Sequence, residues 1–250
     1  MQGSISEKIY AIILAGGSGS RMGADKPKQY LELAGKPVLA HSMIAFEKSE
    51  ADRIYIVCDP SYEEYIKKNI IDIYGITKFA GFAMNGTERV ESVKNGINAA
   101  LEEIQNEEYK NIYLMIHDGA RPLISQELIS RCISSVKKNK AVIPVLPLKD
   151  TIKKISGEVV ELTPDRNDFC AVQTPQCFRA DVIYNAYETF EQSEAEGFVP
   201  TDDASLVEMF TDVNVVTVQG EEVNLKLTTP VDMKVAELFC HPDEQKCMSS

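Results

Sequence analysis

The segment that follows the first apolar run of the chain combines glycines with nearby cations. It reads Ala15-Gly16-Gly17-Ser18, and Arg21, Lys26 and Lys28 come shortly after it. Because glycine has no Cβ, the backbone N–H groups of such a loop can approach a phosphate closely. The spacing matches neither the dinucleotide-binding fingerprint, whose last glycine or alanine is missing, nor the Walker motif, whose Gly-Lys-Ser/Thr ending is missing. The residues therefore point to a cradle for a triphosphate, with a flexible surface turn as the alternative.

Two further loops could bind ligands. Residues 85–89, Asn-Gly-Thr-Glu-Arg, bring small side chains to the start of an expected helix that contains Ser92, and the N–H groups of a helix start attract anions. An ordinary turn is the alternative for this loop. Asp118 follows the most apolar run, residues 112–116, at the edge of the expected sheet where ligands bind. Its carboxylate could hold a ribose hydroxyl or a metal ion, or it could only cap the next turn.

Polar segments in the second half of the chain supply the remaining candidates. They are Asp150-Thr151-Ile152-Lys153, Asp165-Arg166-Asn167, Gln173-Thr174-Pro175-Gln176, Thr201-Asp202-Asp203 and Asn224-Leu225-Lys226-Leu227-Thr228. Arg166 and Lys226 are candidate anion ligands, because each lies among hydrogen-bonding neighbours near a strand end. Taken singly, each could also be a surface cation. Asp202 and Asp203 are expected to be helix N-terminal charges, since negative charge is favourable there.

The elements that must position these residues alternate between short β-rich runs and helical patterns. This order is typical of an α/β fold with helices around a largely parallel sheet. The expected helix starts are Asp59 before Pro60, Ser125, and Thr229-Pro230. The expected strands lie at residues 9–14, 53–58, 78–83, 112–116, 141–146 and 213–218.

One segment, Pro147–Val172, interrupts this alternation. It contains two short β runs on either side of Ser156-Gly157, a pattern typical of a hairpin. An insertion of this kind late in an α/β domain should project from it. It is either a solvent-exposed excursion or an arm that embraces a second subunit.

The composition sets limits on partners and chemistry. The 250 residues include 26 Lys and Arg against 38 Asp and Glu, a net charge of −12 that repels nucleic acid and anionic membranes. At this length an α/β chain is expected to form a single domain, residues 1–250. Neither a signal peptide nor an apolar run of membrane-spanning length is evident, which points to the cytoplasm. Six cysteines without a C-x-x-C pair, and only three histidines, argue against a structural zinc site or a multi-histidine metal site.

Taken in their order along the chain, these segments resemble the motifs of the 2-C-methyl-D-erythritol 4-phosphate cytidylyltransferases of the non-mevalonate isoprenoid pathway. The resemblance runs from about residue 9 to residue 237. Its motifs are the glycine loop with Arg21 and Pro27-Lys28-Gln29, Thr87-Glu88-Arg89 with Ser92, His117-Asp118-Gly119-Ala120-Arg121-Pro122, Asp150-Thr151-Ile152-Lys153, Asp165-Arg166-Asn167, Thr174-Pro175-Gln176 and Asn224-Leu225-Lys226-Leu227-Thr228.

The resemblance implies a fold, an assembly and a reaction. The fold is a Rossmann-like nucleotide-diphosphosugar transferase fold, with a mostly parallel sheet and a projecting β-arm at about residues 147–172 that forms a homodimer. The reaction is transfer of a cytidylyl group from CTP to a sugar-alcohol phosphate, with release of pyrophosphate and with Mg²⁺ as cofactor. Nucleic acid and membranes are not expected as partners.

The resemblance also implies roles for individual residues. Arg21 and Lys28 would stabilise the transition state. The acceptor would be bound by Thr151, Arg166, Thr174 and Lys226, of which Arg166 and Lys226 would position its phosphate. Because Thr151 and Arg166 lie on the arm, they would serve the active site of the partner subunit. The cytidine nucleotide would be bound by segments that contain Ala15, Gly16, Gly17, Ser18, Gly86 and Ser92, with Asp118 near the ribose and the metal.

Two alternatives remain open at this point. The loop sequence Ala-Gly-Gly also occurs in the related ribitol 5-phosphate cytidylyltransferases, whereas Ala-Ala-Gly is common in the methylerythritol phosphate enzymes. The spacing behind the glycine loop and the Asp-Thr-Ile-Lys segment favour methylerythritol phosphate as the acceptor. The other alternative is a catalytically silent CTP-binding dimeric scaffold, against which the presence of all four candidate cations argues: Arg21, Lys28, Arg166 and Lys226.

Overall fold

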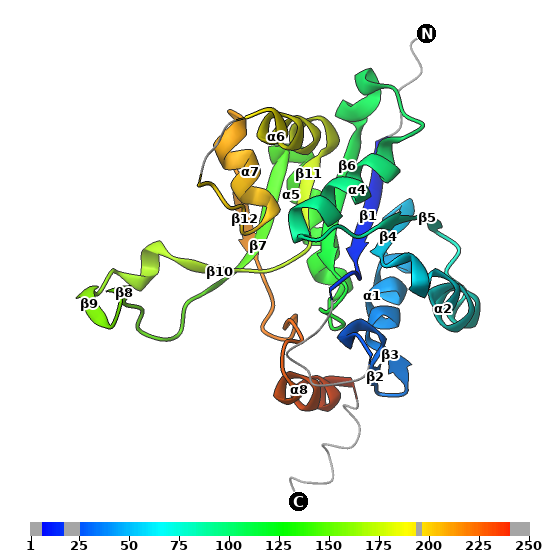
Figure 1. Ribbon diagram of the computed structural model, residues 1–250, viewed down its shortest axis with the longest axis horizontal. Coiled ribbons are helices and arrows are strands. Elements are labelled where there is room, and N and C mark those ends of the chain that lie inside the picture. Colours follow the sequence, from blue (N-terminus) through cyan, green and yellow to red (C-terminus); the bar gives the residue numbers. More distant parts are fainter. Residues whose placement is uncertain (1–6, 18–25, 194–196, 241–250) are drawn as a thin grey trace, which may run out of the picture.

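An eight-stranded sheet forms the centre of the computed structural model, which describes residues 7–17, 26–193 and 197–240. In spatial order the strands are β10 (Cys170–Val172), β7 (Ala141–Pro147), β11 (Gln176–Arg179), β6 (Ile112–Asp118), β1 (Lys8–Leu14), β4 (Arg53–Cys58) and β5 (Phe79–Met84), and β12 (Val216–Gln219) also pairs with β7. Only β10 and β11 run antiparallel to the strands they pair with. The expected α/β class with a mostly parallel sheet is confirmed (Figure 1).

The main differences from the expected strands lie in the second half of the sheet. All six expected strands are present, but β12 begins at Val216, later than expected. β10 and β11 have no counterpart among the expected strands, because each is short and β11 is held by pairing with β6 and β7 on its two sides. β6 extends through Asp118, so this carboxylate belongs to the last residue of the strand.

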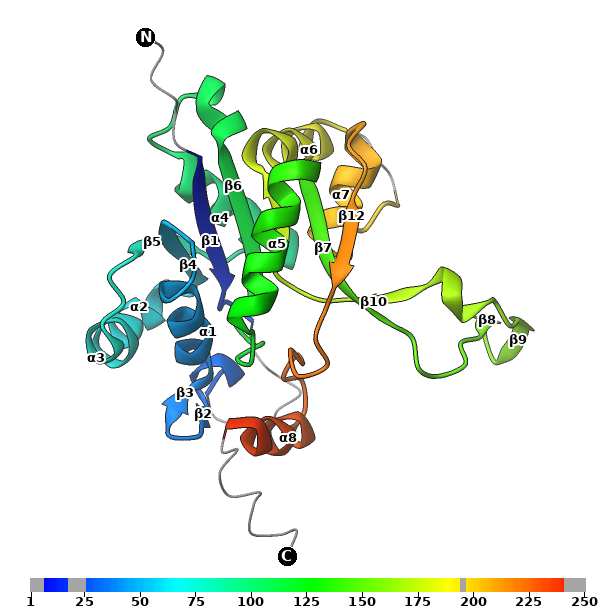
Figure 2. The same ribbon diagram turned by 180° about the vertical axis from the view of Figure 1, so that it is seen from behind.

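Helices cover both faces of the sheet (Figures 1 and 2). On one face lie α1 (Val38–Glu47) and α5 (Gln126–Asn139), and on the other lie α4 (Arg89–Leu101), α6 (Ala180–Gln192) and α7 (Asp203–Phe210). Side chains alternate along β1, so Ala11 and Ile13 join the core under α1 and α5, while Tyr10 and Ile12 join the core under α4. Because both faces are covered, β1 and β4 read as nearly continuous apolar runs.

The expected helix starts are present. Ser125 Oγ accepts a hydrogen bond of 2.9 Å from the Leu128 N–H at the start of α5, and α8 (Pro230–Cys240) begins at the expected proline. After Asp59, however, the helical segment is irregular: a 3₁₀ turn (Pro60–Tyr62), α2 (Glu63–Ile66), a π-type turn (Lys67–Ile71) and α3 (Asp72–Tyr74). Among the described residues, no helix has the length and apolar character needed to cross a bilayer.

The chain leaves the sheet after β7, forms the arm and returns to the sheet at β10. The arm contains β8 (Lys154–Ser156) and β9 (Val159–Leu162), which pair as the expected hairpin, with Gly157 at φ +58° in the turn. Both views show this hairpin projecting from the body (Figures 1 and 2). Every residue of β8 and β9 is exposed, so the hairpin gains little from burial against its own chain.

Candidate active site

A cavity of about 670 Å³ opens where β1, β5 and β6 end. Open α/β sheets bind ligands at this edge. Seven residues proposed from the sequence line the cavity: Gly16, Gly17, Lys28, Gly86, Ser92, Asp118 and Lys226. The fold therefore brings together residues from the glycine segment, the loop before α4, β6 and the segment before α8. Ser18 and Arg21 lie outside the described residues.

The glycine segment is held by Gln29, a side chain to which the motif Pro27-Lys28-Gln29 by itself assigns no role. Gln29 is buried in the 3₁₀ turn Lys28–Tyr30, and its amide donates to the backbone carbonyls of Ala15 and Gly17. A Cβ on Gly16 would lie 2.3 Å from the Cβ of Asn85, so the two loops approach too closely for any other residue there. The glycine segment and the loop before α4 are thus packed against each other.

The loop before α4 is shaped by its own side chains. The Gly86 N–H donates to Ser92 Oγ at 3.0 Å, and the Ser92 hydroxyl donates to the Glu88 carbonyl at 3.1 Å. The N–H and hydroxyl of Thr87 both donate to Glu91 Oε2, at 2.7 and 2.8 Å. The two residues proposed to bind nucleotide, Gly86 and Ser92, therefore bond to each other and fix the curvature of the cavity wall.

Asp118 is the charged group at the end of β6, and cations surround it. Its carboxylate lies 3.0 Å from Lys226 Nζ and 3.6 Å from Arg121 Nε. Burial alone would raise the pKa of Asp118, but the positive charges of Lys226, Arg89 and Arg121 outweigh this effect and hold it well below its usual range. Asp118 is therefore an anion at neutral pH.

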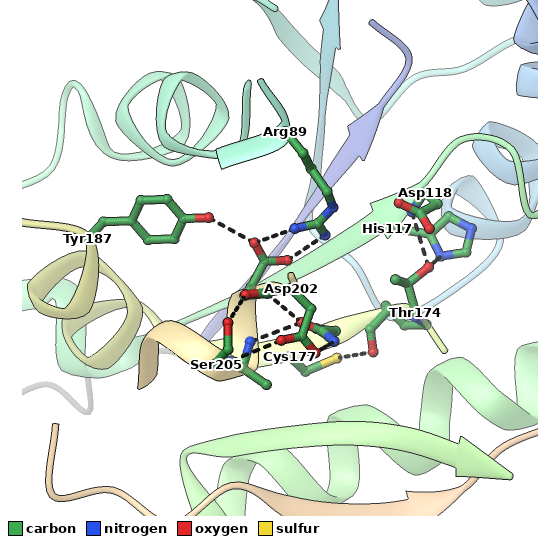
Figure 3. A network of polar contacts seen from close by, with 12 residues as sticks. Arg89, His117, Asp118, Thr174, Cys177, Tyr187, Asp202 and Ser205 are labelled. Atoms are coloured by element: carbon green, nitrogen blue, oxygen red, sulfur yellow. Dashed lines mark hydrogen bonds and ion pairs between the residues drawn. The ribbon is translucent and has the colours of Figure 1, made fainter. Parts of the chain in front are cut away.

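A buried chain of hydrogen bonds orients the end of β6 (Figure 3). The Asp118 N–H donates to Thr174 Oγ1 at 3.1 Å, and Thr174 Oγ1 lies 3.1 Å from His117 Nδ1. His117 Nε2 lies 3.2 Å from the Arg121 carbonyl, which can only accept, so Nε2 carries the proton and Nδ1 accepts from the Thr174 hydroxyl. Burial lowers the pKa of His117 to about 4, so the ring is neutral. Thr174, proposed to bind the acceptor, is 5% exposed and acts in this chain on the orientation of Asp118.

The two acidic residues expected as helix N-terminal charges differ in their roles. Asp202 is the N-cap of α7 and accepts from the Ser205 N–H at 3.0 Å, as expected. Asp203 is 0% exposed and pairs with Arg89, whose Nη1 and Nη2 lie 2.9 and 2.7 Å from its two oxygens. The Tyr187 hydroxyl donates to the same carboxylate at 2.8 Å. Sequence reasoning misses this pair because 114 residues separate its members and neither local sequence indicates the other as a partner.

The arm residues lie apart from this cavity. Thr151 and Arg166 are exposed and neither lines it. Arg166 Nη1 donates to the Lys149 carbonyl at 2.6 Å, within the arm itself. Within one chain, the structure therefore does not bring these two proposed acceptor ligands to Lys28, Asp118 and Lys226.

The residues around the cavity suit a divalent cation that is coordinated mainly by substrate and water better than one that is enclosed by protein ligands. The described residues contain no group of three or more His, Cys, Asp or Glu side chains that could hold a metal ion. Two acidic residues line the cavity, Asp118 and Glu88. Mg²⁺ commonly binds through one or two carboxylates, substrate phosphates and water, so one such carboxylate beside a triphosphate is an adequate protein contribution.

Comparison with known proteins assigns the chain to a family. A model of the family described as IspD, 2-C-methyl-D-erythritol 4-phosphate cytidylyltransferase, matches residues 9–241. The enzyme of that name from Alkaliphilus metalliredigens is 42% identical over 249 residues, covering 98% of each chain. Its counterpart from Lachnoclostridium phytofermentans is 40% identical over 232 residues, covering 92% of this chain and 95% of the relative. The crystal structure of 4-diphosphocytidyl-2C-methyl-D-erythritol synthase from Anaerococcus prevotii matches with a TM-score of 0.79 at 34% identity, covering 94% of this chain and 96% of that one. The chain belongs to the 2-C-methyl-D-erythritol 4-phosphate cytidylyltransferase family.

Proposed function

We infer that the protein transfers the cytidylyl group of CTP to 2-C-methyl-D-erythritol 4-phosphate, which gives 4-diphosphocytidyl-2-C-methyl-D-erythritol and pyrophosphate. The family match over residues 9–241 carries this inference. The cavity supports it, because Lys28, Asp118 and Lys226 converge beside a glycine segment at the ligand-binding edge of the sheet. The presence of these charged groups also favours an enzyme over a silent scaffold.

The reaction requires no general base from the protein. A phosphate monoester has a second pKa of about 6, so the acceptor is mostly a dianion at neutral pH. One of its oxygens attacks the α-phosphorus of CTP, and the bond from that phosphorus to the bridging oxygen breaks, with the electron pair leaving on pyrophosphate. This requirement agrees with the site, since the histidine at the end of β6, His117, is buried, neutral and bonded at both ring nitrogens.

Fixed cations supply the stabilisation that the reaction requires. Two anions must meet, and negative charge grows on the α-phosphoryl oxygens and on the leaving pyrophosphate. We propose that Arg21 and Lys28 stabilise this charge, and that Lys226 and Arg166 position the acceptor phosphate. Lys226 is suited to this role because Asp118 holds its Nζ at 3.0 Å while 41% of its side chain stays exposed.

The nucleotide is proposed to lie on the two packed loops. Their residues are small where they line the cavity, and Gly16 and Gly86 leave no room for a Cβ. We infer that the backbone of these tightly packed loops selects cytosine by excluding the larger purines. The proposed contacts come from the segments that contain Ala15, Gly16, Gly17, Ser18, Gly86 and Ser92.

We propose Mg²⁺ as the cofactor, with Asp118 as its protein ligand. Bound there, the ion would neutralise phosphate charge and orient the triphosphate. Asp118 also pairs with Lys226, so the carboxylate would have to serve both groups or exchange one for the other.

We also propose a homodimer that forms through the arm. Large apolar side chains of the arm are exposed in the single chain: Ile155, Val159, Val160, Leu162 and Phe169. Burial of these side chains against a second chain would offset the cost of their exposure. The same contact would bring Thr151 and Arg166 of one chain to the cavity of the other. A cytoplasmic location is proposed as well, because it suits the free thiols of Cys58, Cys132, Cys170, Cys177 and Cys240.

An acceptor panel tests the function. Purified protein is incubated with CTP, Mg²⁺ and either 2-C-methyl-D-erythritol 4-phosphate or ribitol 5-phosphate, and pyrophosphate release is measured alongside ³¹P NMR of the product. We expect a diphosphate diester with methylerythritol phosphate and little turnover with ribitol phosphate. Preference for ribitol phosphate, or no pyrophosphate with either acceptor, would contradict the proposal.

A further inference from the structure

The buried pair of Arg89 and Asp203 joins two walls of the candidate active site. Arg89 is the first residue of α4 and lines the cavity, and Asp203 is the first residue of α7. Asp203 is fixed on every side, since its carboxylate accepts from Arg89 and Tyr187 while its N–H donates to Gln176 Oε1 at 2.9 Å. The guanidinium is therefore held by a partner that cannot itself move easily.

A second carboxylate lies within the electrostatic reach of the same guanidinium. In the view of Figure 3, Arg89 lies between Tyr187 and Asp118. Arg89 and Asp118 line the same cavity, where the positive charge of Arg89 favours the anionic form of Asp118. Nevertheless, the ion pairs of Asp118 within the described part of the chain are with Lys226 and Arg121, and Arg89 pairs with Asp203.

The geometry explains why Arg89 prefers Asp203. Both carboxylate oxygens of Asp203 face the two terminal nitrogens of Arg89, a bidentate arrangement that is stronger and more directional than a single contact. The Asp203 side chain is 0% exposed, so its attraction is screened less than that of a group in contact with water. Without the Asp203 charge, Asp118, which lines the same cavity, would be free to attract Arg89.

We propose that Asp203 is a positioning residue for cytidylyl transfer, which holds Arg89 away from Asp118, so that no third cation joins Lys226 and Arg121 at the carboxylate proposed to serve the nucleotide and its metal ion. The inference rests on the proposed function, because it assigns to Asp118 a role toward bound CTP. Asp203 itself touches no substrate, since it is fully buried. Its effect passes through Arg89.

An ion pair that only joined α4 to α7 would respond differently to substitution from a pair that restrains Arg89. If the pair only held two helices together, Arg89→Gln would weaken CTP binding as much as Asp203→Asn, because either substitution breaks the pair and leaves one charge without its partner. If Asp203 instead restrains a competing cation, Arg89→Gln removes that cation and should weaken CTP binding much less than Asp203→Asn does. The difference between the two single variants therefore separates the two roles, and relief in the double variant is expected in addition.

The test compares Asp203→Asn, Arg89→Gln and the double variant. Asp203→Asn keeps the shape of the side chain and one acceptor oxygen, but it removes the charge and replaces the second acceptor with an NH2 group that cannot accept from Arg89. We expect it to raise the KM for CTP by about ten-fold and to weaken calorimetric binding of CTP with Mg²⁺ by a similar factor. Arg89→Gln should lose much less CTP binding than Asp203→Asn, and the double variant should recover most of the loss. Near-normal CTP binding by Asp203→Asn, an Arg89→Gln variant that loses as much as Asp203→Asn, or a double variant no better than Asp203→Asn would overturn the proposal.

A matched pair elsewhere in the chain serves as the control. Arg179 and Asp181 form a similar two-point pair, at 2.6 and 2.7 Å, and neither residue lines the cavity. Asp181→Asn should leave the KM for CTP unchanged. If Asp203→Asn does not fold, as shown by circular dichroism, Arg89→Lys takes its place. This variant keeps a positive charge at the cavity but loses the two-point contact with Asp203, so a KM for CTP raised above that of Arg89→Gln supports the proposal, whereas an equal KM overturns it.

The same measurements distinguish failure of this inference from failure of the proposed function. If the unsubstituted protein releases no pyrophosphate with the acceptor, the proposed function is wrong. Calorimetric binding of CTP by the variants still tests the role of Asp203 in that case, because it requires no turnover.

Discussion

Around the cavity, Asp118 and Asp203 are buried and each is bonded to several partners, whereas on the arm Thr151 and Arg166 are exposed and bonded only locally. The ends of the strands and the starts of the helices hold the cavity side chains in place within one chain. On the arm, the hairpin orders only its own backbone, and its side chains lie away from the cavity of the same chain.

This difference shows which functional residues a single chain can position. The cavity supplies preorganised charge, which acts on a transition state without a cost of reorganisation. The arm supplies side chains whose place depends on what it packs against. Exposed apolar groups such as Val159 and Phe169, 68% and 48% exposed, make a second chain the expected packing surface.

The largest effect on activity is expected from substitution of a cation at the cavity. Lys28→Ala should lower kcat by about 10² or more, because it removes one preorganised charge from the transition state. The fold should survive, since Lys28 is only partly buried. Steady-state kinetics with saturating CTP and acceptor provide the measurement, with circular dichroism as the check on folding. Arg21→Ala is expected to behave alike, and near-normal turnover in both variants would refute their assignment.

Mixing two inactive variants should show that the arm residues act in the site of a second chain. Arg166→Ala should lower acceptor use by about 10² while CTP binding stays nearly intact, and Arg166→Lys should recover little because the bidentate contact is lost. When Arg166→Ala protein is mixed with an equal amount of Lys28→Ala protein, about a quarter of the sites should become active, because half of the dimers are mixed and one of the two sites in each mixed dimer is intact. Absence of any recovery, with subunit exchange confirmed, would mean that each site is built from one chain.

A smaller effect is expected on assembly. Phe169→Ala should weaken the dimer by about ten-fold, because a large apolar side chain no longer fills the interface. Sedimentation over a range of concentrations gives the dissociation constant. Ile73, which is 63% exposed on α3, provides the control, and Ile73→Ala should leave the dimer unchanged. A Phe169→Ala dimer as tight as that of the unsubstituted protein would show that the arm does not carry the interface.

The smallest effect should appear as a pH slope of stability that originates at the cavity. The pKa of His117 is lowered to about 4 in the folded chain, below the ordinary value of 6.5. Between these values the unfolded chain binds more protons, so the free energy of unfolding should fall as pH falls, by about 1 kcal/mol for each pH unit from this group. His117→Asn should flatten the slope in urea unfolding measured from pH 7 to pH 4.5. An unchanged slope would show that His117 is not held neutral.

Periodicity and start signals were sufficient to predict most of the framework. The apolar runs of β1, β4 and β6 are long because both faces of the sheet are buried, and Ser125 and Pro230 mark helix starts through local backbone chemistry. The hairpin of the arm is equally local, since its turn depends on Gly157. The family motifs likewise identified Lys28, Asp118 and Lys226, which the structure then placed around one cavity.

Tertiary structure alone decided the features that depend on pairing between distant residues. β11 is a strand because β6 and β7 lie on its two sides, and its own four residues give little β signal. Asp203 looked like an ordinary helix N-terminal charge until the fold brought Arg89 within 2.7 Å of it. Thr174 is proposed as an acceptor ligand from its motif, and only the fold shows that its hydroxyl also bonds to His117 and to the Asp118 N–H. The physical reason is common to all three: the sequence determines what a side chain can bond, and only the fold determines which group is within reach.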